Sequence, residues 1–203
     1  PRGPAADVMA AVRADRWPEA EIAAAQYVDP VARKLVAYYR MLAPHAASAA
    51  EIAAFMAENP DWPFQTLLAR RLDEAIAAEP DDAAAATLCR AHPPAAAATL
   101  ERCADAFASG AFATGPEATA MARAAWVKGD AGVPWEVACV QRWGSALRPQ
   151  DERARFDALA RRDAAAATRQ ATRLTGDDRL AALARLALPA GALAAAAVLA
   201  EVP

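Results

Sequence analysis

The chain has 203 residues, a formal net charge of −3 at pH 7 and a hydrophobic fraction of 56%, of which alanine supplies much. This length can bury a substantial core, and the acidic balance argues against nucleic acid as a partner, because nucleic-acid binders normally carry a basic field. Alanine has the highest helix propensity and no strand-like alternation occurs, so the sequence predicts an all-α fold.

Capping signals predict where the early helices begin. Asp29 before Pro30 pairs a good N-cap residue with a proline suited to the first helical position, and "VARKLVAYYRML" follows. Ser48 and Glu51 have the spacing of a capping box, in which serine is the N-cap and glutamate stands three residues later. A further helix, "IAAFMAEN", is therefore expected after them.

The stretch "AENPDWPFQTLLARR" holds two prolines and a tryptophan in an otherwise alanine-rich chain. Asn59 is expected to end the preceding helix, because a residue before proline is pushed out of the α region. Pro63 is expected in the first turn of the next helix, where its missing N–H costs nothing. Trp62 is expected to lie largely buried between the helices on either side.

Similar punctuation recurs along the rest of the chain. Further joints are expected at Pro80 to Asp82, His92 to Pro94, Gly110, Gly115-Pro116, Gly129, Pro134, Pro149, Thr175-Gly176 and Pro189 to Gly191. Three stretches share a helix-turn-helix plan: "AVRADRWPEAEIAAAQ", "AFASGAFATGPEATAMARAAW" and "ALARRDAAAATRQATRL". The sequence thus predicts a single domain, residues 1–203, built as a right-handed superhelix of stacked antiparallel helical hairpins. It would be a tetratricopeptide-like solenoid with irregular repeats.

The pattern of polar residues gives no candidate site: no catalytic, cofactor-binding or metal-ligating residue is predicted, and no cofactor. His45 and His92 lie in proline-flanked joints and not at metal-ligand spacing. Ser48, Ser109 and Ser145 show no nucleophile-elbow pattern. The carboxylates are spread along helix faces, as is typical of surface ion pairs.

The tryptophans suit either the stacking of sugar rings or the packing of helix joints, and packing is the favoured interpretation. They are Trp17, Trp62, Trp126, Trp135 and Trp143. Of the adjacent Arg70 and Arg71, one is expected to meet a carboxylate of a neighbouring helix and the other to be solvated.

The cysteines and the chain ends bear on the compartment. Cys89 and Cys103 are expected on consecutive helices, offset by some 9 Å at about 1.5 Å per residue. A disulfide spans about 7 Å between Cα atoms, so free thiols are expected.

The closing "LALPAGALAAAAVLAEVP" is too short and too interrupted to span a membrane. The opening "PRGPAADVMA" has no apolar run, which suggests a removed signal peptide or a trimmed chain.

Several segments together resemble one enzyme family. Residues 48–77, "SAAEIAAFMAENPDWPFQTLLARRLDEAIA", are similar to the region of soluble lytic murein transglycosylases in which a helix ends in Asn-Pro-Asp-Trp-Pro and an arginine-rich helix follows. "ATAMARAAWVKGD" and "VQRWGSALRPQDERARFDALARRDAAAA" resemble later parts of the same superhelical domain, including its ARxAW-like helix and its L-x-P-x-D turn. The similarity covers most of the chain and keeps the family's order.

The sequence also departs from the family. At Arg161 to Asp163, where the family often has tryptophan and glycine, this chain reads "RRDAAAA". The family's lysozyme-like catalytic domain carries a Glu-Ser dipeptide and a Gly-Leu-Met-Gln segment, and neither occurs here. The resemblance therefore implies the N-terminal, non-catalytic superhelix alone, with the downstream catalytic domain as its partner.

Two functions are compatible with the sequence. The resemblance implies a periplasmic scaffold whose parent protein cleaves peptidoglycan between N-acetylmuramic acid and N-acetylglucosamine, leaving 1,6-anhydro products. Peptidoglycan would then be a partner through the parent, whereas this segment itself would be non-catalytic. The alternative is a tetratricopeptide-like adaptor whose concave surface binds a protein. The ordered resemblance favours the first.

Overall fold

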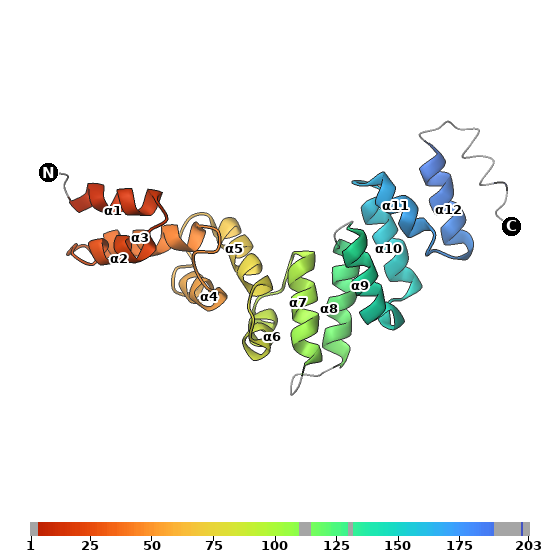
Figure 1. The fold of residues 1–203 in the computed structure, drawn as a ribbon, viewed down its shortest axis with the longest axis horizontal. Helices are drawn as coiled ribbons and strands as arrows, with labels where there is room; N and C mark the ends of the chain where they lie inside the picture. The colour runs from red at the N-terminus through yellow and green to blue at the C-terminus, as the bar shows by residue number, and fades with distance from the viewer. Residues whose placement is uncertain (1–3, 110–114, 130–131, 189–199, 201–203) are drawn as a thin grey trace. The chain divides into compact units, whose positions relative to one another are not determined.

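The computed structural model describes residues 4–109, 115–129, 132–188 and 200, and throughout these residues the only regular elements are helices (Figure 1). The prediction of an all-α fold is therefore confirmed. Contacts divide the chain into two compact units, Pro1–Pro94 and Ala95–Pro203. The expectation of a single domain stays a prediction, and each unit is described by itself.

The first unit contains six described helices. They are α1 (Pro4–Arg13), α2 (Trp17–Ala24), α3 (Pro30–Leu42), α4 (Ala49–Glu58), α5 (Gln65–Ala77) and α6 (Asp82–Ala91). Each helix packs against the next one along the chain, and α3 also contacts α1 and α5. Near the N-terminus the small core consists of Val8, Ala11, Ala20, Ala24 and Val36.

The second unit begins with α7 and ends its described helices at α12. Its elements are α7 (Ala97–Ala108), α8 (Gly115–Lys128), α9 (Val133–Trp143), the 3-10 helix η2 (Gly144–Ala146), α10 (Pro149–Leu159), α11 (Ala164–Ala171) and α12 (Gly176–Ala187). Helices α7 and α8 lie side by side (Figure 1), α8 also contacts α9 and α10, and α10, α11 and α12 pack in succession.

Local capping signals predicted several helix starts correctly. The Asp29 carboxylate accepts a hydrogen bond from the Val31 N–H at 2.8 Å, at the start of α3. Ser48 and Glu51 form the reciprocal capping box at the start of α4. The last residue of α4 is Glu58 and Asn59 is its C-cap, so the helix stops before Pro60 as predicted. These positions depend only on residues within one turn, so sequence alone identifies them.

The prediction for Pro63 was wrong, because α5 begins at Gln65 and its N-cap is Phe64. The turn before it has hydrogen bonds of its own. The Tyr38 hydroxyl donates to the Pro63 carbonyl at 2.8 Å, and the Gln65 side-chain amide donates to the Asn59 and Trp62 carbonyls at 3.1 and 2.9 Å. Phe64 takes a left-handed conformation with φ of 57°, which is unusual for a bulky residue, and helical geometry starts only after it.

The three predicted helix-turn-helix stretches fall on α1 and α2, on α7 and α8, and on α10 and α11, and each of these pairs is in contact. Residues 110–114 of the second stretch and the joint at Pro189 to Gly191 lie outside the described residues.

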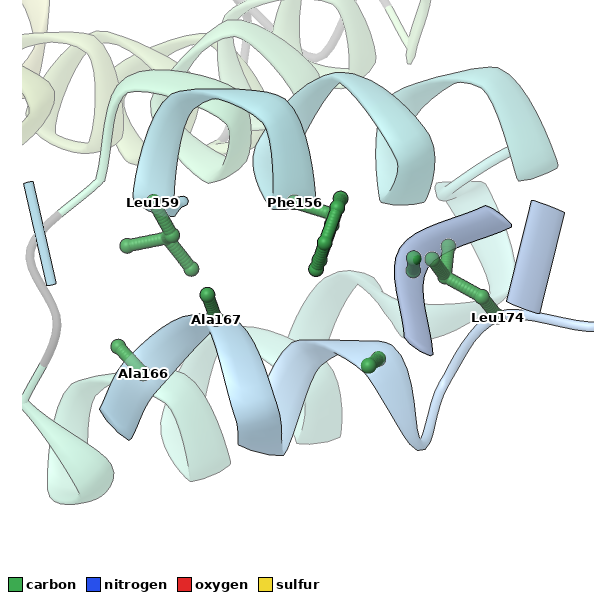
Figure 2. Packing of buried hydrophobic residues seen from close by; sticks show 7 residues of the cluster. Phe156, Leu159, Ala166, Ala167 and Leu174 are labelled. Carbon is green, nitrogen blue, oxygen red and sulfur yellow. The ribbon is translucent and has the colours of Figure 1, made fainter. Parts of the chain in front are cut away.

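Alanine allows these helix pairs to approach closely. In Figure 2 the side chains of Phe156 and Leu159 on α10 point toward Ala166 and Ala167 on α11. Leu174, after α11, joins the same buried cluster. Large side chains on one helix thus fill the space that small ones leave on the other, and each fully buried leucine or phenylalanine contributes about 1.5–3 kcal/mol.

Candidate functional site

The histidines do not form a site. His45 lies in the turn between α3 and α4, where it is exposed and has φ of 58°. His92 is the C-cap residue of α6. Across the described part of the chain, no group of three or more His, Cys, Asp and Glu side chains could hold a metal ion.

Trp62 sits in an aromatic cluster that joins the turn after α4 to two earlier helices. Its ring centroid lies 4.9 Å from that of Tyr38 on α3 and 5.7 Å from that of Phe55 on α4, both edge-on. The Lys34 ammonium lies 5.7 Å from the Trp62 ring centroid. The expected packing role is therefore present, but Trp62 is half-buried, and its ring partners are on α3 and on α4, of which α4 alone flanks it.

Arg70 is solvated, with 72% of its side chain exposed, as predicted for one of the two arginines, but the predicted carboxylate of a neighbouring helix was wrong. Both bind Glu74 on their own helix, Arg70 at 3.0 Å and Arg71 at 2.7 Å. Arg71 also donates to the Leu42 carbonyl at 2.8 Å, which links α5 to the end of α3. The contact with α3 is thus made to a backbone carbonyl. The carboxylate that both arginines bind is that of Glu74, three residues after Arg71 and four after Arg70.

The prediction of free thiols was wrong for two of the three cysteines. Cys89 and Cys103 are disulfide-bonded, whereas Cys139 is a free, buried cysteine. The prediction assumed two ideal straight helices in a simple hairpin. Burial raises the pKa of the Cys139 thiol to about 11, so this residue is not a reactive nucleophile at neutral pH.

Several aromatic and charged side chains of the second unit surround Arg155 on α10. Arg155 is completely buried, and its guanidinium carbon lies 4.2 Å from the Trp126 ring centroid and 5.2 Å from that of Trp135. The two indoles are nearly parallel, with centroids 5.9 Å apart. The arginine also donates to the Trp126 carbonyl at 2.6 Å and to Glu136 at 3.0 Å. One side chain therefore ties α10 to α8 and α9.

Close packing around Trp135 requires a glycine. Gly129 follows the last residue of α8, and a methyl group there would overlap the Trp135 ring and come within 2.7 Å of the Ala125 carbonyl oxygen. The Trp135 indole N–H donates to Glu101 on α7. Gly129 therefore gives α9 room to place its tryptophan beside Trp126.

Glu152, also on α10, binds several side chains as well. It accepts hydrogen bonds from the Trp126 indole at 3.1 Å, from Gln170 at 2.6 Å and from Arg173 at 2.5 Å. Burial acts to raise the pKa of Glu152, but the hydrogen bonds from Arg173 and Gln170 outweigh it and the pKa is lowered. A general acid needs a raised pKa, so this carboxylate is suited to holding helices together and not to donating a proton.

A groove adjoins this network between α9 and α11. It has a volume of about 260 Å³ and is lined by Trp126, Glu136, Val137, Val140, Gln141, Arg169, Gln170 and Arg173. Val137 and Val140 supply apolar surface, whereas Trp126 is only 1% exposed. Arg169 and Arg173 are paired with Glu136 and Glu152. Arg169 binds Glu136 at 3.3 Å and keeps 40% of its side chain exposed.

Sequence patterns indicated part of this arrangement. They assigned packing roles to the tryptophans, and Trp126 is indeed buried, with 1% of its surface exposed. The other four are half-buried. The pattern gave no sign of the role of Arg155, because an arginine in "DERARF" has the composition of a solvated helix face, and only the positions of α8 and α9 reveal its burial.

None of the helices that the structure describes is long and apolar enough to cross a membrane. No protein-family model, curated protein or solved structure matches this chain.

Proposed function

We propose that this chain is the non-catalytic helical scaffold of a periplasmic lytic transglycosylase. In this proposal the helical hairpins stack as a right-handed, tetratricopeptide-like superhelix. They dock a lysozyme-like catalytic domain located downstream in the parent protein. The parent cleaves the glycan strands of peptidoglycan between N-acetylmuramic acid and N-acetylglucosamine, and the scaffold frames access for that long polymer.

The proposal is supported most by a contact between two of the segments that resemble the transglycosylase family. Trp126 belongs to the "ARAAW" segment and Arg155 to the "PQDERARF" segment, which are separate in sequence but keep the family's order. Their side chains pack 4.2 Å apart in a buried cluster. The residues that carry the resemblance are thus framework residues of the second unit, as a shared scaffold would require.

The first unit adds the same kind of support. The Asn-Pro-Asp-Trp-Pro joint is held by Tyr38, whose hydroxyl binds the Pro63 carbonyl, and by the contact of Trp62 with Phe55. Asn59, at 4% exposure, donates its side-chain amide to the Phe55 carbonyl at 2.8 Å. The turn between α4 and α5 is held by hydrogen bonds and ring contacts, which favours a structural role for this motif.

The acidic residues also suit a scaffold better than an enzyme. Glycosidic cleavage needs a carboxylic acid with a raised pKa beside the scissile oxygen. Three glutamates, Glu51, Glu74 and Glu152, have lowered pKa values because hydrogen bonds to the carboxylates outweigh burial. Each is held in its ionised form by neighbours on its own or an adjacent helix.

A protein-binding adaptor is the second candidate, and the groove between α9 and α11 is the observation that favours it. The two functions differ in the kind of domain that the parent protein carries downstream of this segment. For the scaffold, the coding sequence beyond residue 203 should encode a Glu-Ser dipeptide and a Gly-Leu-Met-Gln segment. Reading that sequence tests the proposal, and a continuation with neither feature would contradict the scaffold and leave the adaptor.

A further inference from the structure

We draw no further inference here: the strongest candidate, the apolar face of α3 on which Val31, Leu35 and Tyr39 are 61%, 40% and 40% exposed, carries none, because nothing in the structure shows what covers it.

Discussion

The guanidinium of Arg155 lies 4.2 Å from the centre of the Trp126 ring, and neither side chain reaches solvent to more than 1% of its surface. A charge buried this deeply is costly unless it is paired and hydrogen-bonded. Here the Trp126 carbonyl and Glu136 accept its hydrogen bonds. Burial lowers the pKa of Arg155 and the bond to Glu136 opposes that change, so the contact combines packing and charge pairing at one point.

The first prediction concerns this pair. Arg155→Ala should lower the free energy of unfolding by about 3–5 kcal/mol, because it leaves buried hydrogen-bond acceptors without their donor. Urea denaturation followed by circular dichroism measures the loss. The control is Arg185→Ala, which breaks a half-exposed pair with Asp157 and should cost less than about 1 kcal/mol. Equal effects of the two substitutions would contradict the structural role of Arg155.

A second prediction concerns the joint before α5. Trp62→Ala should lower the free energy of unfolding by about 2–3 kcal/mol, less than the roughly 3–5 kcal/mol of a fully buried tryptophan, because the ring is half-buried. Trp62→Phe should cost less, since a phenyl ring can keep part of the edge-on contact with Tyr38 and Phe55. Thermal melting of both variants measures the difference. An unchanged melting temperature in Trp62→Ala would contradict the packing role and favour the alternative, in which Trp62 stacks against sugar rings.

The amount that sequence predicts depends on the range of each interaction. Asp29, Ser48 and Asn59 act within a turn of their own positions, and their roles were read correctly from the chain. Pro63 was misassigned, since α5 begins only after Phe64 in its left-handed conformation. The Pro63 carbonyl instead accepts a hydrogen bond from Tyr38, 25 residues earlier. No local pattern indicates that contact.

The buried network shows the same limit more strongly. Arg155 binds a backbone carbonyl 29 residues away, and Glu152 has partners on both α8 and α11. In sequence both residues have the polar character of a solvated helix face. Their burial results from three helices meeting. The cysteines give a second example: Cys89 and Cys103 are disulfide-bonded, whereas ideal helix geometry predicted free thiols.

Acid should weaken the second unit through Glu152. Its pKa is lowered in the folded chain from an ordinary value of 4.5, so its ionised form stabilises the fold above that value. The contribution is lost as the pH falls below 4.5 through the folded pKa. Glu152→Gln should be less stable at neutral pH and should lose less stability on acidification. Urea midpoints measured from neutral pH downward test this, with exposed Glu19→Gln as the control. A loss in Glu152→Gln as steep as in the unmodified chain would contradict the assignment.

Thiol titration should distinguish the three cysteines. Without reductant the folded chain should react with no equivalent of a thiol reagent within minutes, because Cys139 is buried and its pKa is raised to about 11. After unfolding without reductant, one of the three cysteines should react, since Cys89 and Cys103 are disulfide-bonded. Reduction should release all of them. Three reactive thiols in the unfolded, unreduced chain would contradict the disulfide.

The most direct test of the scaffold assignment is an assay on peptidoglycan with two proteins. One is the chain of residues 1–203, and the other is the same chain extended through the downstream domain of the parent. Each is incubated with purified murein sacculi, and soluble 1,6-anhydromuropeptides are measured by mass spectrometry. The account predicts release by the extended protein and none by residues 1–203. Release by residues 1–203 alone, or no release by the extended protein, would contradict it.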